Sequence, residues 1–275
     1  MTLRRRTVLT GAAALLAAGP ARARISGLDL TGRFVQGGHA LGRTWPNALV
    51  FVDGEALSAA SDSGWFVVGF DRDAPVSVSI EARAGARSAR RTLDIAPGNF
   101  RTTRIDGLPP STVEPTDPAL LERIRRELAL KTEGFASRAD ADHFRDGFQW
   151  PLSSYRITSP WGAQRILNGT PARPHYGIDL AAPQGAPIRA PAAGRVTLAE
   201  PDLHFEGGLV LLDHGQGLIT AYLHQSRLDV RAGQDVVRGQ TLGRVGMTGR
   251  ATGPHLCWRM KWRDRNLDPS LLVKG

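Results

Sequence analysis

The sequence predicts a mainly β protein with a small N-terminal β-sandwich, a helical linker and a C-terminal antiparallel β-sheet domain. Three observations lead to this fold class. Short apolar segments separated by turn residues fill both ends of the chain, as is typical of strands. One segment in the middle has apolar residues at helical spacing. Near the C-terminal end, two apolar strands are joined by a short glycine-containing turn, which indicates a hairpin.

Residues 1–23 have the features of an export signal. They combine three consecutive arginines at 4–6, an apolar run over 8–18 and a small-x-small cleavage site at Ala21-Arg22-Ala23. The string over 5–9 also resembles a twin-arginine signal. The apolar run is too short for a convincing membrane-spanning helix. We therefore expect a periplasmic or secreted protein whose mature chain starts near residue 24.

The sandwich is predicted over residues 24–106. Apolar segments cover 48–52, 65–70 and 76–80, and the first of them ends at the turn pair Asp53-Gly54. Strands at this spacing are typical of a small all-β domain of the immunoglobulin-like type. No group of catalytic residues is recognisable in this part of the chain.

Residues 107–148 are predicted to be a helical linker. Pro109-Pro110 breaks regular structure, and Asp117-Pro118 then signals a helix start, with Asp as the cap and Pro at the first helical position. Apolar and charged residues alternate at helical spacing up to Leu130, so the helix should pack its apolar stripe on a neighbouring domain. A second helical segment is expected over 138–148.

The C-terminal domain is predicted over residues 149–275. Apolar segments at 194–198, 209–212 and 218–223 are separated by turns, which favours an antiparallel sheet built from hairpins. The glycine-rich stretch 246–253 lacks the lysine-plus-hydroxyl ending of a phosphate-binding loop. Its glycines are expected to let the backbone turn tightly.

Three short motifs in this domain carry the chemistry: His175-x-x-x-Asp179, Tyr222-x-His224 and His255-x-Cys257. In an extended chain, alternate side chains share a face, so the first and third motifs each place two potential metal ligands together. Zinc accepts imidazole, carboxylate and thiolate ligands, and a catalytic site uses three of them and leaves one position open. The two histidines that remain, His224 and His255, would act as bases or hold a developing oxyanion.

With these motifs the chain resembles the lysostaphin/LytM-type zinc endopeptidases, whose pattern is H-x-x-x-D, then Y-x-H, then G-P-H-L-H. The resemblance extends to the segments 159–162 with Arg165, 185–194 and 239–246, and so covers roughly the last 125 residues by motif. It implies zinc held by three residues, His175, Asp179 and Cys257. It also implies catalytic roles for His224 and His255, and cleavage of peptide bonds in peptidoglycan.

The departure from the family pattern is Cys257, which stands in place of the third zinc-binding histidine. Thiolate is a good zinc ligand, with Zn–S near ~2.3 Å against about 2.0–2.1 Å for nitrogen. Two anionic ligands would make a bound water less acidic. Two alternatives stay open. Cys257 is a small buried residue in a metal-free module that binds the wall or regulates an amidase, or it is a nucleophile beside His255.

The resemblance also sets the expected mechanism and partners. A zinc-activated water would attack the scissile carbonyl, with His255 activating the water and His224 stabilising the oxyanion, and these two roles are interchangeable. Peptidoglycan is the expected partner. The N-terminal domain would bind the wall or a protein partner, shield the active-site groove, or serve as a spacer.

Composition agrees with an exported protein that acts on an acidic polymer. The formal net charge is +9, and removing residues 1–23, which contain four arginines and no acidic residue, leaves +5. No basic helix, aromatic-studded sheet motif or zinc finger indicates a nucleic-acid partner.

A single cysteine cannot form an internal disulfide, and an unprotected thiol is a liability outside the cytoplasm, which favours a ligand role for Cys257. The histidines outside the motifs are expected to be structural: His39, His143, His204 and His214.

Overall fold

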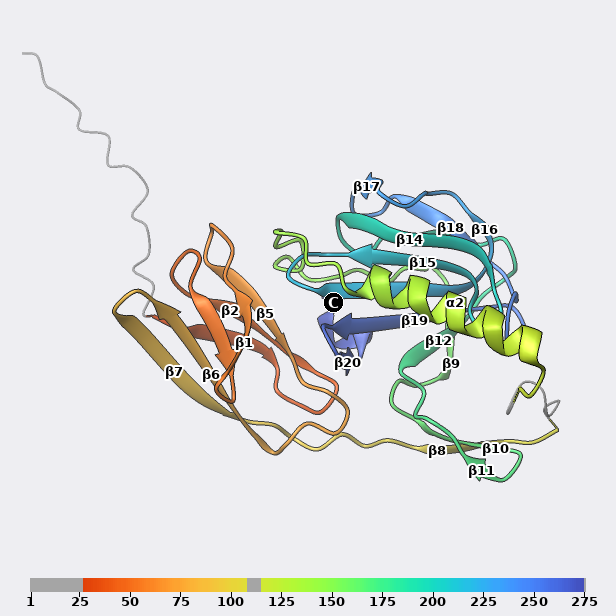
Figure 1. Cartoon of the computed structure of the whole chain (residues 1–275), viewed down its shortest axis with the longest axis horizontal. Helices are drawn as coiled ribbons and strands as arrows, with labels where there is room; N and C mark the ends of the chain where they lie inside the picture. The colour runs from red at the N-terminus through yellow and green to blue at the C-terminus, as the bar shows by residue number, and fades with distance from the viewer. Residues whose placement is uncertain (1–26, 108–114, 275) are drawn as a thin grey trace, which may run out of the picture.

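The computed structural model describes residues 27–107 and 115–274 and is mostly β-strand (Figure 1). The predicted export signal, residues 1–23, lies outside the described residues. Within the described ranges, no helix has both the length and the apolar character needed to cross a membrane.

The N-terminal part is a two-sheet β-sandwich, as predicted. One sheet has the strand order β1-β2-β5 and the other β4-β3-β6-β7. Inward side chains such as Val50, Phe66 and Ile80 are fully buried between them, whereas β7 exposes most of its residues. The predicted turn at Asp53-Gly54 has positive φ values of 50° and 88°, which a tight hairpin requires. The strands are β1 (Asp29–Arg33), β2 (His39–Arg43), β3 (Leu49–Val52), β4 (Glu55–Ala59), β5 (Trp65–Gly69), β6 (Ser77–Ala84) and β7 (Arg87–Asp94).

After the sandwich, the chain runs along the C-terminal part as β8 (Thr102–Ile105). This strand falls in the range predicted for the first domain, yet it pairs in parallel with β10 (Gln164–Leu167), which in turn pairs with β11 (Thr170–Pro171). Figure 1 shows β8 leaving the sandwich and lying beside β10 and β11. The N-terminal half of the chain thus contributes a strand to the second half.

The linker contains one long helix, α2 (Pro118–Phe135), which starts where the sequence predicts. The Asp117 side chain accepts a hydrogen bond from Leu120 N at 2.7 Å and caps the helix. The helix packs on β14 (Gly194–Leu203), and Lys131 forms an ion pair with Glu206 at 2.7 Å. It contacts this sheet through Glu127 and Gly134, which are its buried residues. The expected packing of the apolar stripe is wrong for its C-terminal part, because Leu128 and Leu130 are exposed.

The second helical segment predicted over 138–148 is wrong, because this stretch is a series of turns. Besides short turn bonds such as Arg145 N to Asp142 O at 3.1 Å, its backbone groups bond to the turn of the hairpin that follows residue 213. Ala139 N donates to the Asp213 carboxylate at 3.0 Å, and Gln216 N donates to Ala139 O at 2.8 Å. These long-range partners replace the local bonds of a helix.

The C-terminal part is built on a ten-stranded antiparallel sheet with the main path β17-β14-β15-β16-β19-β12-β9. The predicted hairpin between β15 and β16 is confirmed, with Asp213 opposite Ile219. Every residue of β15 is buried, so the centre of this sheet is covered on both faces. The strands are β9 (Arg156–Ser159), β12 (Gly177–Ala181), β13 (Pro187–Arg189), β14 (Gly194–Leu203), β15 (Gly207–Asp213), β16 (Leu218–Leu228), β17 (Asp235–Val236), β18 (Thr241–Val245), β19 (His255–Trp262) and β20 (Arg265–Leu267), followed by the short 3₁₀ helix η1 (Pro269–Leu272).

The sandwich packs against the C-terminal end of β19 and against β20. Gly69 of β5 lies so close to Trp262 and Leu267 that a Cβ atom would come within 2.9 Å of Trp262 Cβ and 2.8 Å of Leu267 Cδ2. Buried residues of both parts belong to one continuous hydrophobic core. At ~3.3 Å per residue, the start of β19 at His255 is roughly 23 Å from this contact.

Candidate metal centre and its histidines

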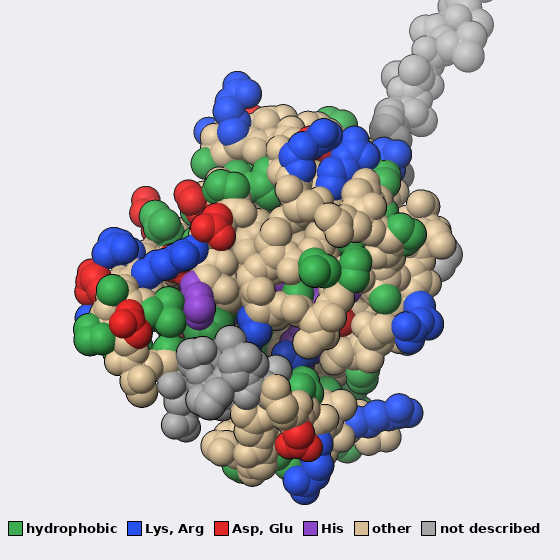
Figure 2. Space-filling model, turned by 90° about the vertical axis from the view of Figure 1, so that its right-hand side faces the viewer, with side chains coloured by type: hydrophobic (Ala, Val, Ile, Leu, Met, Phe, Trp, Pro, Cys, Tyr) green, Lys and Arg blue, Asp and Glu red, His purple; other side chains and the backbone are tan. Residues whose placement is uncertain are grey.

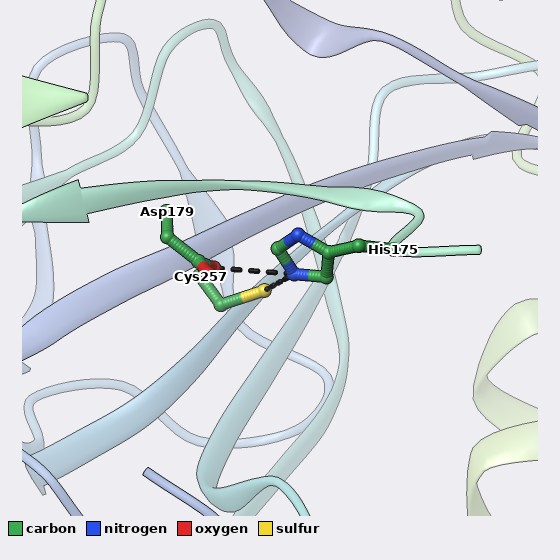
Figure 3. A group of neighbouring side chains, drawn as sticks. All are labelled: His175, Asp179 and Cys257. Carbon is green, nitrogen blue, oxygen red and sulfur yellow. Dashed lines mark hydrogen bonds and ion pairs between the residues drawn. The ribbon is translucent and has the colours of Figure 1, made fainter. Parts of the chain in front are cut away.

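Three potential metal ligands converge beside the start of β19. One ligand atom each from His175, Asp179 and Cys257 lies within 4.8 Å of the other two. Figure 3 shows the three side chains pointing toward one another, with His175 approaching from the segment before β12. His175 Nε2 lies 3.2 Å from Asp179 Oδ1 and 3.4 Å from Cys257 Sγ.

Strand pairing explains why two of these ligands are neighbours. In the antiparallel β12–β19 pair, Asp179 stands directly opposite Cys257. His175 lies two residues before β12 begins, and backbone bonds hold it in place, because its N donates to Ala163 O and its O accepts from Gly162 N, both at 2.8 Å. Its Nδ1 is 3.1 Å from Ser159 Oγ, which leaves Nε2 to face the cluster.

Asp179 has the environment of an ionised ligand. Burial would raise its pKa, but the nearby His175 ring and the charges of His255 and Arg165 outweigh burial and hold the pKa below its usual range. Oδ2 accepts a hydrogen bond from Arg165 at 3.4 Å. Oδ1 is buried and has no hydrogen-bond donor among the described residues, although His175 Nε2 is at ion-pair distance.

This arrangement fits a tetrahedral cation with nitrogen, oxygen and sulfur ligands. Burial lowers the pKa of His175, which favours the neutral ring, and neutral imidazole is a zinc ligand. The buried Asp179 Oδ1 beside it has no hydrogen-bond partner among the described residues. Ligands at zinc distances of ~2.0–2.3 Å in tetrahedral geometry are about 3.3–3.6 Å apart. The separations of 3.2 and 3.4 Å from His175 Nε2 agree with that geometry.

Cys257 is only 1% exposed and lies in the same cluster. Burial raises the pKa of its thiol to about 12. A protonated thiol without solvent access is a poor nucleophile, so the geometry speaks against the cysteine-peptidase alternative. Arg259 donates from Nε to Cys257 Sγ at 3.5 Å. A metal that binds here would have to displace the thiol proton.

His224 and His255 lie together beside the cluster, with ring centroids 4.7 Å apart. His224 Nδ1 is 2.8 Å from Thr248 O, and His255 Nδ1 is 2.8 Å from Gly253 O. A carbonyl oxygen only accepts hydrogen bonds, so each Nδ1 carries a proton, and Nε2 is the atom on which a neutral ring would keep its lone pair. Burial lowers the pKa of His224 to about 4. His255 Nε2 is 3.8 Å from Asp179 Oδ1 and thus adjoins the candidate metal position.

The remaining histidines stand apart from this group. His214 is fully buried with both ring nitrogens occupied, Nδ1 by Ala193 O at 2.7 Å and Nε2 by Thr220 Oγ1 at 2.8 Å. His39 is buried in the sandwich. His143 is exposed, and His204 lies in the turn between β14 and β15.

Several residues of the site carried no predicted role. Arg165 belongs to the family pattern but was given no function, and the contacts of Ser159 and Thr248 depend on distant segments. Arg259 was detectable in principle. It follows Cys257 by two positions, and alternation along a strand places the two side chains on the same face.

On the face shown in Figure 2, His and Lys/Arg side chains are recessed among uncharged ones near its centre. The cluster itself is only narrowly open, because the side chains of His255 and Asp179 are 15% and 13% exposed and that of His175 is 3% exposed. His255 and Asp179 are thus the more accessible members of this group, and His175 is the least.

A family profile and several curated proteins match part of this chain. Residues 173–269 match the profile of Peptidase family M23. Peptidoglycan DD-endopeptidase ShyA of Vibrio cholerae is 37% identical over 139 residues, which are 50% of this chain and 32% of ShyA. Cell division protein DipM of Caulobacter vibrioides is 35% identical over 132 residues, which are 46% of this chain and 21% of DipM. The matched part thus spans a third or less of these two curated relatives.

A solved structure matches nearly the whole chain. It comes from Pseudomonas aeruginosa, is assigned to peptidase M23 and is 31% identical, with a TM-score of 0.68. The match covers 88% of this chain and 95% of that one.

Proposed function

This chain belongs to peptidase family M23, and we propose that it is an exported zinc endopeptidase that hydrolyses peptide crosslinks of bacterial peptidoglycan. ShyA, which shares the C-terminal half, is named as a peptidoglycan DD-endopeptidase. The export signal expected over 1–23 and the surplus of positive charge agree with action on an acidic, extracytoplasmic polymer.

The observation that carries this proposal is the convergence of three metal-binding atoms beside two histidines. A structural metal site is closed by four protein ligands, whereas three ligands leave a position open for chemistry. Two histidines next to that open position supply the means of moving a proton.

The chain's own residues have distinct tasks in the proposed reaction. His175, Asp179 and Cys257 would hold zinc, which when bound supplies a Lewis acid for the scissile carbonyl and the attacking water. His255 accepts the proton of that water at Nε2, since its Nδ1 is committed to the Gly253 carbonyl. His224 stabilises an oxyanion only after it has taken a proton at Nε2, because its own Nδ1 proton is held by Thr248 O.

Metal analysis of the purified protein under reducing conditions tests the zinc site. We expect about one zinc ion per chain. A four-ligand zinc site is worth about 10–16 kcal/mol, so loss of one ligand in Cys257→Ala should weaken zinc binding by roughly 10²–10³-fold. Cys257→His should retain zinc, because imidazole is an equivalent ligand.

Digestion of purified peptidoglycan by the zinc-loaded protein tests the activity. Release of free peptide ends that stops on chelation and returns with zinc is the expected result. A wild-type protein that holds no zinc, or that holds zinc and cleaves no crosslink, contradicts the proposal.

A second candidate function is a catalytically silent module that binds the wall or regulates an amidase. Two guanidinium groups favour it, because Arg165 contacts Asp179 and Arg259 contacts Cys257, so cations already accompany both acidic ligands. Wild-type protein free of zinc, with unchanged stability on adding the metal, would favour this candidate.

A further inference from the structure

Arg259 reaches back along β19 to the sulfur of Cys257. Its Nε donates to Sγ at 3.5 Å, and the side chain is half-buried. The two residues share a face of the strand, since they are two positions apart. The donor is a guanidinium, so the hydrogen bond is charge-assisted and directional.

The neighbouring strand is shaped to admit this pair. Gly177 of β12 stands opposite Arg259 in the β12–β19 register. A Cβ atom on residue 177 would lie 2.6 Å from Cys257 Sγ and 3.0 Å from Arg259 Cγ. Real Cβ atoms do not approach other atoms that closely, so glycine at this position leaves the space in which sulfur and guanidinium meet.

We propose that Arg259 is a positioning residue for the metal site: its Nε–H bond to Sγ orients Cys257 toward His175 and Asp179 and offsets the negative charge that a thiolate ligand brings. The inference rests on the proposed zinc site. Hydrogen bonds from outside the ligand set typically change metal affinity by 10–100-fold.

The charges around Arg259 agree with this role. The acidic groups that act on the guanidinium are Asp179, Glu206 and Cys257 itself. Glu206 is already paired with Lys131 at 2.7 Å, and Asp179 with Arg165 at 3.4 Å. Of the ligand atoms in the cluster, the sulfur is the one that receives the Arg259 hydrogen bond.

Cobalt titration of the metal-free full chain tests this assignment. Co²⁺ substitutes for zinc, and coordination by sulfur gives a charge-transfer absorption in the near ultraviolet. In Arg259→Met we expect Co²⁺ affinity to fall about 10–100-fold and the sulfur-to-cobalt band to shift and weaken. Arg259→Lys, which keeps the charge but not the directional donor, should be intermediate. Lys261→Met, two residues further on the same strand face, is the matched control and should match wild type.

Each other outcome has a definite meaning. Equal affinity and an equal band in Arg259→Met would overturn the inference while leaving the zinc site standing. Tighter Co²⁺ binding in Arg259→Met would overturn it too, because Arg259 would then compete with the metal. A wild-type chain that binds no Co²⁺ would overturn the proposed function together with the inference. Thermal unfolding of the metal-free variants shows which of them are folded. If Arg259→Met does not fold, the comparison of Arg259→Lys with wild type tests the inference.

Discussion

The two ends of β19 differ in the chemistry of the groups they bury. At the C-terminal end, Trp262 is fully buried against the sandwich beside Leu267, where a Cβ atom on Gly69 would meet carbon atoms of both residues. At the N-terminal end, the buried groups are Cys257 and Asp179, and Asp179 Oδ1 lies 3.2 Å from His175 Nε2 without a hydrogen-bond partner among the described residues. One strand thus joins an apolar packing contact to a polar cluster that could hold a metal.

The difference indicates where stability and chemistry reside. Burial of apolar area at the sandwich contact stabilises the fold. Burying a carboxylate that keeps an unpartnered oxygen costs free energy, and proteins retain such departures from good packing chiefly at functional sites. Substitutions at the two ends should therefore have separable effects, and the following predictions probe that separation from the largest effect to the smallest.

The largest effect on activity is expected from the two histidines beside the N-terminal end of β19. His255→Ala should lower the rate of crosslink cleavage roughly 10²–10⁴-fold, because the proton acceptor is lost. Zinc content and melting temperature should stay near wild type, because His255 is not one of the proposed zinc ligands. His224 has a φ of 65°, so asparagine, which tolerates that backbone, is the better replacement there.

Exposed His143→Ala serves as the control for a histidine outside the site and should cleave like wild type. Full activity in both His255→Ala and His224→Asn would refute the catalytic roles given to these residues.

At the opposite end, Trp262→Ala should destabilise the fold without touching the chemistry. Removal of a fully buried Trp typically costs about 3–5 kcal/mol in the free energy of unfolding. Urea unfolding monitors the loss, and zinc affinity measured under folding conditions should stay within about twofold of wild type. A large drop in zinc affinity would mean that the two ends of β19 are coupled.

A smaller loss in the free energy of unfolding is expected on acidification, because of buried histidines remote from the site. Burial lowers the pKa of His39 to about 3 and that of His214 to about 4. The unfolded chain takes up protons first, near pH ~6.5, so the stabilisation from each neutral ring is complete above that pH and is lost as the pH falls toward the folded pKa. Between pH 7 and 5, each should contribute about 2 kcal/mol of lost stability.

Urea unfolding of wild type and His39→Gln at both pH values isolates one of these contributions. The loss between pH 7 and 5 should be about 2 kcal/mol smaller in the variant. An equal loss in both proteins would show that His39 is protonated as readily in the folded chain as in the unfolded one.

Local patterns were enough to predict several elements. Asp117-Pro118 marks the start of α2, Asp53-Gly54 forms a hairpin turn, and the β15–β16 hairpin follows from two apolar runs around glycines. These features depend on neighbours within a few residues, which the sequence displays directly. The turns over 138–148 were misjudged because their hydrogen-bond partners lie in a hairpin some 75 residues away, at Asp213.

The sequence by itself determined the chemical set of the candidate site, since the spacing of His175, Asp179, His255 and Cys257 names the ligands and bases. Only the tertiary structure decided how they meet. The β12–β19 register places Asp179 opposite Cys257 and leaves Gly177 to admit Arg259, while His175 is held outside the strand by the segment around Ala163. Strand registers and contacts between segments far apart in the chain result from the packing of the whole core, and no local pattern encodes them.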